Sequence, residues 1–459
     1  MTNSLECFKA YDIRGRVPEE LSPELARLVG RAFVAEIDPG TVVVGRDMRL
    51  ESPEISAALI QGLTDYGADV LDLGLCGTEE VYFQTFDRGV GGGIMVTASH
   101  NPKGFNGMKL VREDARPISG DTGLHEIKAR VRAMLGGSPE QRTRKSGSVD
   151  PAPEKRNYID HLLGLVENDV LRSLRIVADP GNGMAGPIIW ELAERLPFEF
   201  VMLHDQPNGH FPNGVPNPLL IENRAATARG VVENQADFGI AWDGDFDRCF
   251  LYDETGRFIE GYYLVGLLAE LLLTRNPGAK IVHDPRLTWN TIDLVRAAGG
   301  HAVQSKTGHA FIKERMRKED AVYGGEMSAH HYFRDFAYCD SGMIPWMLTA
   351  ELICRSGKSL SQLVDERVRA FPCSGEINYR VPDATAALER IEAHFASKRP
   401  GIDRTDGLSL EFSDWRLNIR PSNTEPLLRL NIESRGRPKL VAQKLAELEN
   451  LIGKCAPSA

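Results

Sequence analysis

The stretch TVVVGRDMRLESPEISAALIQGLTDYGADVLDLG, residues 41–74, contains the pattern that decides the fold. An apolar run leads into a Gly-Arg-Asp loop, and a second apolar run, ADVLDL, closes the stretch. Between them, Ser52 is predicted to be the N-cap of a helix with Pro53 at its first position. The helical spacing of Ile55 and Leu59 marks the face of this helix that is predicted to be buried. The stretch therefore predicts a strand, a helix and a second strand.

The same order of elements recurs twice along the chain. Residues 174–204 and 279–309 each run from an apolar strand, through an Asp-Pro loop, to a helix and another strand. Strands that alternate with helices predict parallel sheets. We therefore expect three similar α/β domains with mixed, mostly parallel sheets, and a smaller C-terminal α+β domain, arranged around a central cleft. The predicted boundaries are 1–150, 151–255, 256–368 and 369–459.

The C-terminal domain is predicted from a different pattern. After about residue 370, the runs GLSLEF, WRLNIR and LLRLNIES read as strands and PKLVAQKLAELENLI reads as an amphipathic helix. A polar stretch rich in Gly, Pro and Ser, GGSPEQRTRKSGSVDPAPEK, is expected to be a surface linker between the first two domains.

Composition excludes several classes of protein. The 459 residues carry a net charge of −10, which argues against a nucleic-acid-binding surface. No apolar run reaches the roughly 18 residues of a membrane span, and the N-terminus lacks a signal-peptide pattern, so we expect no membrane association. Seven scattered cysteines without a C-x-x-C pair indicate reduced thiols and a cytoplasmic location. The sequence does not predict the oligomeric state.

The loop DGDFDR offers three alternating carboxylates, Asp243, Asp245 and Asp247. In an extended segment they would point the same way, and at about 4 Å each like-charged pair would cost about 4 kcal/mol at an effective dielectric of about 20. A divalent cation removes that cost, and ligands that are all oxygen favour Mg²⁺, Mn²⁺ or Ca²⁺ over zinc. An exposed acidic turn is the alternative interpretation.

Three further loops carry polar side chains. In TASHNPKGFNGMK, Ser99 could be a nucleophile, although the G-x-S-x-G elbow is absent and an Asn-Pro turn with an incidental serine is the alternative. GEMSAHH, residues 325–331, carries groups that suit sugar hydroxyls, and RPSNTEP, residues 420–426, carries an arginine and small donors that suit a phosphate. The alternative interpretation of GEMSAHH is a polar loop with a structural histidine, and that of RPSNTEP is a turn bounded by prolines. Cations at other loops, taken together, suit a doubly phosphorylated ligand: Arg14, Lys109, Arg248, Arg286, Lys306 and His309.

AYDIRG, TASHNPKGFNGMK, DGDFDR, GEMSAHH and RPSNTEP resemble, in this order, the five motifs of the α-D-phosphohexomutases. The resemblance covers essentially the whole chain. Within the family, GEMSAHHYFRDF is similar to the phosphomannomutase and phosphoglucomutase group, above all to bacterial phosphomannomutases that supply GDP-mannose for surface polysaccharides.

The resemblance also implies a set of site residues. Ser99 would carry the phosphoryl group, and an oxygen of its phosphate together with Asp243, Asp245 and Asp247 would hold one Mg²⁺. Glu326 and Ser328 would bind sugar hydroxyls. The phosphate that is not transferred would be bound by Arg420, Ser422, Asn423 and Thr424. The other positions implied in substrate contact, charge neutralisation or proton exchange are Tyr11, Arg14, His100, Lys109, Arg248, Arg286, His309 and His330.

The implied reaction is the reversible conversion of mannose 6-phosphate to mannose 1-phosphate through a hexose 1,6-bisphosphate. The free hydroxyl of the hexose phosphate would accept the phosphoryl group, and the bisphosphate would turn around before the return transfer. A phosphoglucomutase or a dual-specificity phosphohexomutase is the alternative within the family. A serine-dependent metal phosphatase and a sugar-phosphate-binding regulator are alternatives from other classes.

Overall fold

The structure, a computed structural model, describes residues 5–137, 145–151, 155–421 and 427–452. The chain divides into two compact units. Residues 332–357, predicted to belong to the third α/β domain, are part of unit 1, and the four predicted domain boundaries stay a prediction. In the described ranges, no helix has the length and apolar character needed to cross a bilayer. Unit 1 comprises Met1–Phe258 and Tyr332–Gly357, and unit 2 comprises Ile259–His331 and Lys358–Ala459.

The first sheet of unit 1 has six strands in the order β1-β5-β4-β2-β3-β6. The central strands β2, β3 and β4 run parallel, whereas β5 and β1 run antiparallel to their neighbours, so the sheet is mixed as predicted. The strands are β1 (Ile13–Arg16), β2 (Thr41–Arg46), β3 (Asp69–Leu75), β4 (Gly92–Val96), β5 (Phe105–Arg112) and β6 (Val149–Pro151). The helices are α1 (Pro23–Ile37), α2 (Ser52–Asp65), α3 (Thr78–Asp87) and α4 (Leu124–Leu135).

The two faces of this sheet have different cores because side chains alternate along β2. Val42 and Val44 belong to a cluster that also includes residues of α1, α2 and α4. Val43 belongs to a separate cluster with Val81 of α3. A strand covered on both faces needs apolar residues at consecutive positions, which explains the run in residues 42–44.

The start of α2 differs from the prediction in one detail. The N-cap residue is Glu51, and Ser52 is the first helical residue, followed by Pro53. Ser52 Oγ donates to Oδ1 of Asp47, a buried carboxylate directly after β2, and accepts a hydrogen bond from Nδ2 of Asn106. The hydroxyl that the sequence assigned to the helix therefore supports the loop before it.

The second sheet of unit 1 has the order β10-β9-β7-β8. β7 runs parallel to β8 and β9, and β10 pairs antiparallel with β9. Residues 332–333 pair with residues 339–340, and a helix follows. The four strands of this sheet are β7 (Arg175–Asp179), β8 (Glu199–Met202), β9 (Phe238–Trp242) and β10 (Cys249–Asp253). The pair β14 (His331–Phe333) and β15 (Cys339–Asp340) is not part of it. The helices are α5 (Arg156–Gly164), α6 (Ala185–Ala193), α7 (Ala225–Glu233) and α11 (Ile344–Ser356).

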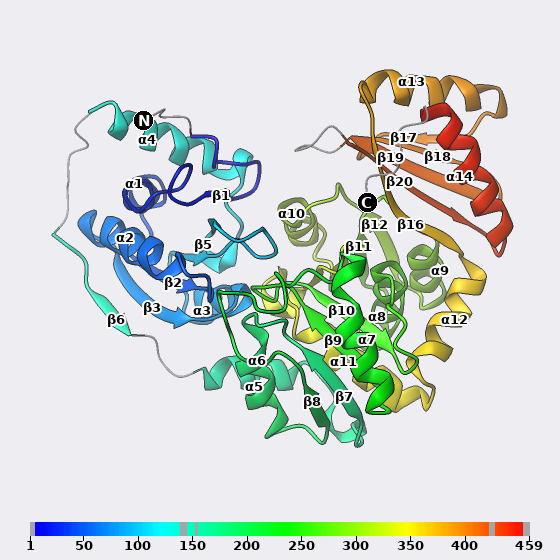
Figure 1. Ribbon diagram of the computed structural model, residues 1–459, viewed down its shortest axis with the longest axis horizontal. Helices are drawn as coiled ribbons and strands as arrows, with labels where there is room; N and C mark the ends of the chain where they lie inside the picture. The colour runs from blue at the N-terminus through cyan, green and yellow to red at the C-terminus, as the bar shows by residue number, and fades with distance from the viewer. Residues whose placement is uncertain (1–4, 138–144, 152–154, 422–426, 453–459) are drawn as a thin grey trace. The chain divides into compact units, whose positions relative to one another are not determined.

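Unit 2 contains the third repeat and the C-terminal domain. β11 lies between β12 and β13 and runs parallel to both. The C-terminal strands form an antiparallel sheet in the order β16-β20-β19-β18-β17, and α13 and α14 lie along it (Figure 1). The predicted strands and final helix of this domain are confirmed. The strands are β11 (Lys280–His283), β12 (His301–Gln304), β13 (Tyr323–Gly325), β16 (Cys373–Arg380), β17 (Gly401–Asp403), β18 (Leu408–Glu411), β19 (Trp415–Pro421) and β20 (Leu427–Ser434). The helices are α8 (Gly261–Arg275), α9 (Trp289–Ala297), α10 (His309–Glu319), α12 (Leu360–Ala370), α13 (Ala384–Phe395) and α14 (Pro438–Ile452).

Candidate active site

Ser99 lies in the loop after β4 and has a left-handed backbone, with φ of +48°. Non-glycine residues rarely adopt this conformation, and it persists where the surroundings fix it, often at functional sites. The Ser99 N–H donates to Thr97 Oγ1 over 2.9 Å, and Thr97 Oγ1 donates to Asp47 Oδ2 over 2.7 Å. A buried chain of hydrogen bonds therefore connects the loop to the end of β2.

The hydroxyl of Ser99 lies between a carboxylate and cationic groups. Ser99 Oγ donates to Asp243 Oδ2 over 2.6 Å and lies 3.0 Å from Nδ1 of His100. Arg248 Nη2 donates to Ser99 Oγ over 3.3 Å and also to His100 Nδ1. Burial and the guanidinium groups of Arg248 and Arg14 lower the pKa of His100, which keeps its ring neutral and Nδ1 free to accept that bond.

The three aspartates converge as predicted, but through a turn and not through an extended strand. Asp243, Asp245 and Asp247 are buried between β9 and β10, and one carboxylate oxygen of each lies within 4.8 Å of the others. A turn at residues 244–245 and a left-handed Phe246, with φ of +46°, bring them together. A short turn can aim alternate side chains at one point as well as an extended segment does.

Two cations balance part of this charge. Lys109 Nζ donates to Asp245 Oδ2 over 2.6 Å and also to Asp247, and Arg248 Nε donates to Asp243 Oδ2 over 2.9 Å. Burial disfavours the charged form of Lys109, but Asp245 and Asp247 outweigh it and raise the pKa of this amine. Burial, followed by the neighbouring carboxylates, raises the pKa of Asp243 to about 7 although Arg248 opposes the shift. When all three carboxylates are ionised, they exceed the two cations by one negative charge.

The acidic cluster fits a hard divalent cation. Asp245 Oδ1 is buried and has no hydrogen-bond partner among the residues that the structure describes. A buried carboxylate oxygen without a donor costs free energy, and a cation coordinated by oxygen would remove that cost. The donor set is oxygen only, which suits Mg²⁺ better than zinc.

Close backbone contact fixes the acidic loop against the Ser99 loop. A Cβ at Gly244 would lie 2.7 Å from the Ser99 carbonyl oxygen, and a Cβ at Gly77 would lie 1.9 Å from the ring of Phe246. The Thr78 N–H donates to the Asp245 carbonyl over 3.0 Å, and its hydroxyl donates to the Asp245 carboxylate. These two glycines allow elements of the first sheet to meet the acidic loop.

Arg14 and Tyr11 come from the segment around β1. Arg14 Nη1 donates to the Ala98 carbonyl over 3.2 Å and to Asn101 Oδ1 over 2.7 Å, and Nη2 donates to Asp12. Tyr11 is half-buried two residues before β1. The structure therefore brings Arg14 to the Ser99 loop, where the resemblance had implied a catalytic role.

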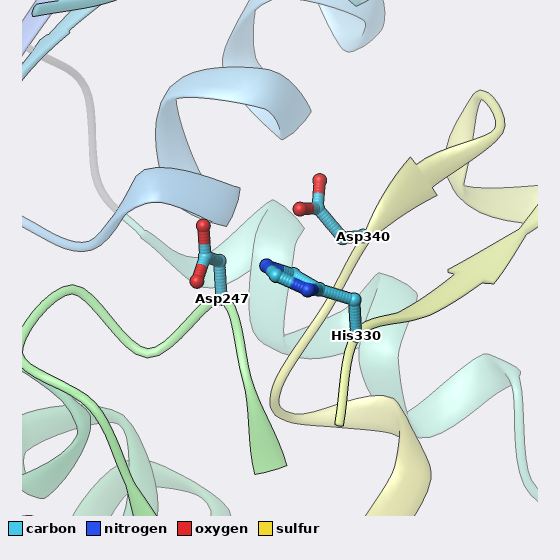
Figure 2. A group of neighbouring side chains, drawn as sticks. All are labelled: Asp247, His330 and Asp340. Carbon is cyan, nitrogen blue, oxygen red and sulfur yellow. The ribbon is translucent and has the colours of Figure 1, made fainter. Parts of the chain in front are cut away.

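Asp340 on β15 is an acidic neighbour that the sequence analysis did not select. One of its carboxylate oxygens lies within 4.8 Å of a carboxylate oxygen of Asp247 (Figure 2). Both residues belong to unit 1, whereas His330, drawn in the same figure, belongs to unit 2. The stretch YCDSG around Asp340 gave no motif signal.

In unit 2, the loop after β13 carries Glu326, Ser328 and His330. Arg286 Nη2 lies 3.3 Å from Ser328 Oγ, and its guanidinium lies 3.6 Å from Glu326. His330 Nδ1 lies 3.5 Å from Glu326 Oε2 and 3.4 Å from Ser328 Oγ. Glu326 Oε1 accepts the N–H of Gly308, directly before the predicted His309 at the start of α10. The predicted groups of this loop therefore form one side-chain network.

Arg286 is buried and held by carboxylates. Its Nη2 donates to Asp284 Oδ2 over 2.8 Å, and its Nη1 lies 3.6 Å from Glu376. Burial disfavours its charge, but Asp284 and then Glu376 outweigh this effect and raise its pKa. Arg420 also donates to Glu376, over 3.0 Å, so Glu376 joins the two predicted arginines. The other predicted phosphate-binding residues, Ser422, Asn423 and Thr424, lie outside the described residues.

Two further residues were missed although a signal existed. Asp47 and Arg49 occupy the loop after β2, as Asp284 and Arg286 occupy the loop after β11. Alignment of the repeats would have matched Arg49 to Arg286, which the resemblance had implied in substrate contact. Thr78 was missed because its partner, Asp245, is remote in the sequence.

Comparison with protein families matches four regions of the chain. They are described as phosphoglucomutase/phosphomannomutase alpha/beta/alpha domain I at residues 5–135, domain II at residues 156–256, domain III at residues 260–371 and the C-terminal domain at residues 376–450.

Relatives that match over nearly the full length include two named "Phosphomannomutase". That of Salmonella typhimurium is 58% identical and that of Escherichia coli is 56% identical, each over 455 residues, 98% of this chain and 99% of the relative. "Phosphohexose mutases" of Xanthomonas campestris is 59% identical over 449 residues, again 98% of this chain and 99% of the relative.

A crystal structure of a phosphoglucomutase/phosphomannomutase family protein from Burkholderia thailandensis has a TM-score of 0.87 and 31% identity, covering 99% of both chains. A Thermus thermophilus structure, titled as a putative phosphomannomutase, has a TM-score of 0.80 at 22% identity, covers 96% of this chain and 98% of its own, and shows the shared fold alone. With four matched domains and full-length relatives above 50% identity, the chain belongs to the phosphoglucomutase/phosphomannomutase family, the α-D-phosphohexomutases.

Proposed function

We propose that this protein is a phosphomannomutase, an isomerase that interconverts mannose 6-phosphate and mannose 1-phosphate through a phosphoserine at Ser99. The observation that carries this proposal is the Ser99 hydroxyl, which donates to Asp243 within a buried cluster of three carboxylates, a lysine and an arginine. The names of the full-length relatives at 56% and 58% identity support the preference for mannose.

Asp243, Asp245, Asp247 and an oxygen of the Ser99 phosphate would hold one Mg²⁺. When bound, the ion neutralises charge on the phosphoryl oxygens. The unpartnered, buried Asp245 Oδ1 supports this assignment within the described residues. Lys109 and Arg248 already contact the same carboxylates, so they remain near the transferred group whichever substrate is present.

The chemistry consists of two phosphoryl transfers in opposite directions. In the first, the P–O bond to Ser99 breaks, a P–O bond to the free sugar hydroxyl forms, and the hydroxyl proton moves through a general base to Ser99 Oγ. The product is a hexose 1,6-bisphosphate. In the second, the other phosphate of this intermediate returns to Ser99, which restores the phosphoserine and releases the isomeric monophosphate. Positioning and charge neutralisation supply most of the acceleration in such transfers.

The protein supplies these functions from separate loops. Arg14, His100, Lys109 and Arg248 surround Ser99, where they orient the loop and balance the charge of the phosphoryl group. Glu326 and Ser328 bind sugar hydroxyls, and His330 exchanges protons. The remaining substrate contacts are assigned to Tyr11, Arg286, His309, Arg420, Ser422, Asn423 and Thr424. We place the reaction in the cytoplasm, where it feeds the synthesis of GDP-mannose for polysaccharides.

A dual-specificity phosphohexomutase is the second candidate. It is favoured by the relative at 59% identity, whose name, "Phosphohexose mutases", specifies no single sugar. Mannose and glucose phosphates differ only in the orientation of the C2 hydroxyl. Coupled assays on mannose 1-phosphate and glucose 1-phosphate, compared by kcat/KM, separate the two candidates.

Ser99→Ala tests the proposed function. With mannose 1-phosphate and trace bisphosphate, turnover should fall by roughly 10⁴-fold or more while the protein stays folded, because the phosphoryl carrier is lost. Ser56→Ala is a matched control, since Ser56 is also buried in unit 1 and its hydroxyl has no partner among the described residues. Near-normal turnover of Ser99→Ala would refute the assignment. Phosphate release by the wild type without isomerisation would instead identify a phosphatase.

A further inference from the structure

Arg49 lies beneath the Ser99 loop with only 1% of its surface exposed. Its guanidinium donates to four main-chain carbonyl oxygens of the surrounding segment. Nη2 donates to the Ser99 and Asn101 carbonyls over 2.8 and 2.6 Å, and Nη1 donates to the Pro102 and Phe105 carbonyls, each over 3.0 Å. One side chain therefore contacts the backbone on both sides of the loop.

Arg49 is itself fixed by its neighbours. Its Nε lies 3.5 Å from Oδ2 of the fully buried Asp47, and its own N–H donates to Asp47 Oδ1 over 3.0 Å. The ring of Phe211 covers the guanidinium, with 5.2 Å between Cζ and the ring centroid. Asp47 also accepts the hydroxyl of Thr97, which in turn accepts the Ser99 N–H. The N–H and the C=O of Ser99 are therefore held by the same Asp-Arg pair.

The arginine at the equivalent place in the third repeat makes different contacts. Arg286 also follows an aspartate by two residues. Its guanidinium forms hydrogen bonds with side chains of the loops after β11 and β13, those of Asp284 and Ser328, whereas Arg49 donates to main-chain carbonyls. In the second repeat, Gly181 stands at this place. The first repeat thus differs from the others in using this position to bind backbone, and the loop that it binds carries Ser99.

We infer that Arg49 is a positioning residue that fixes the backbone of Ser99 in its left-handed conformation for phosphoryl transfer. This inference rests on the proposed role of Ser99 as the phosphoryl carrier. Arg49 donates to carbonyl oxygens and not to the Ser99 hydroxyl, so it acts through the loop. A phosphoserine carries a charge of about −1.5 to −2 and must meet an acceptor in line on each transfer, and an error of about 1 Å can cost 10²-fold in rate.

Arg49→Lys and Arg49→Met test this role. Lysine keeps the charge but replaces the planar fork by one ammonium group, which cannot satisfy four carbonyls in this geometry. Methionine retains an unbranched side chain and removes every donor. The matched control is Arg112→Met, because Arg112 lies at the end of β5 in the first sheet and its guanidinium donates to the Thr122 carbonyl, away from the loop.

Three measured quantities distinguish a role of Arg49 in positioning Ser99 from a role in stabilising the fold alone. They are kcat and KM for mannose 1-phosphate, the phosphate content of Ser99 after incubation with hexose 1,6-bisphosphate, and the rate at which the phosphoenzyme loses phosphate to water. We expect kcat to fall about 10²-fold in Arg49→Met and less in Arg49→Lys, with KM within threefold of the wild type. Phosphate loss to water, relative to transfer to sugar, should rise in both variants and stay unchanged in Arg112→Met.

Each contrary outcome has a distinct meaning. A folded Arg49→Met variant with wild-type kcat and phosphoserine lifetime would overturn the inference. Failure of both variants to fold, judged by circular dichroism, would reduce Arg49 to a structural residue and would overturn it as well. If the wild type itself acquires no phosphate on Ser99, the proposed function fails, and this result is visible before any Arg49 variant is measured.

Discussion

In both the first and the third repeat, the first strand is followed by an aspartate and, two residues later, an arginine. The two pairs differ in what they bind. In repeat I, Arg49 holds main-chain carbonyls, and Asp47 holds the loop through Thr97. In repeat III, Arg286 and Asp284 belong to a network of side chains, and among the described residues one bond, from the Met327 N–H to Asp284, reaches the backbone of the next loop.

The difference indicates two kinds of site. Backbone hydrogen bonds fix the path of a loop, which suits a group that must return to one position after every transfer. Side-chain pairs can exchange partners when a ligand supplies new ones, which suits recognition of a bisphosphate presented in either orientation. We therefore interpret the unit 1 loops as a rigid phosphoryl carrier and the unit 2 loops as an adaptable sugar site.

Among three changes that test this comparison of the units, Asp245→Asn should have the largest effect, because it removes negative charge from a carboxylate whose Oδ1 has no partner among the described residues. We expect the Mg²⁺ concentration at half-maximal activity to rise by roughly 30-fold or more, while KM for mannose 1-phosphate changes less than threefold. Glu326→Gln in unit 2 is the control and should do the reverse. An unchanged Mg²⁺ midpoint in Asp245→Asn would contradict the metal assignment and, with it, the division of roles between the units.

A smaller effect is expected from Asp284→Asn. The amide nitrogen would face the N–H of Met327 and the guanidinium of Arg286. The loop after β13 would therefore lose the hydrogen bond from Met327 that connects it to residue 284. KM for mannose 1-phosphate should rise about tenfold with kcat nearly unchanged, as measured by steady-state kinetics. Asp179→Asn is the matched control from repeat II, where the aspartate contacts His204 and Thr227 and not a predicted site loop. Equal effects of the two changes would remove the distinction between the repeats.

The smallest effect on turnover is expected from Glu79→Gln. Glu79 is fully buried in α3 and accepts the Tyr158 hydroxyl and the N–H groups of Gly342 and Met343. Burial raises its pKa from 4.5 to about 8. The folded state then holds this proton more tightly than the unfolded state, so the stability it contributes is full below pH 4.5 and is lost as the pH rises through about 8.

Glutamine keeps the shape and cannot titrate, and its amide can donate to the Tyr158 oxygen. From pH 5 to 9, the free energy of unfolding of the wild type should therefore fall relative to that of Glu79→Gln, by up to about 4 kcal/mol. Urea denaturation at several pH values measures this difference. Glu54→Gln on the exposed face of α2 is the control and should follow the wild type. Parallel profiles for Glu79→Gln and the wild type would show that this carboxyl does not titrate with unfolding.

Much of the architecture was predictable because it depends on local periodicity. The alternation of apolar strands and helices predicted the parallel strands, and the C-terminal pattern predicted the final sheet and helix. Ser99 and the three aspartates were identified because their motifs are contiguous. The N-cap of α2 was predicted wrongly at Ser52, whose hydroxyl donates to Asp47 and accepts from Asn106, both outside the helix.

The sequence by itself determined the elements, the family and the chemical groups, because these depend on residue type and short-range order. Only the tertiary structure decided which groups meet. Ser99 reaches Asp243 across 144 positions of sequence, and Lys109 reaches Asp245 across 136. The left-handed backbone of Ser99, the close approach at Gly244 and the four carbonyls around Arg49 arise from packing between remote segments. No local pattern encodes them, because each depends on the position of a partner that the fold alone supplies.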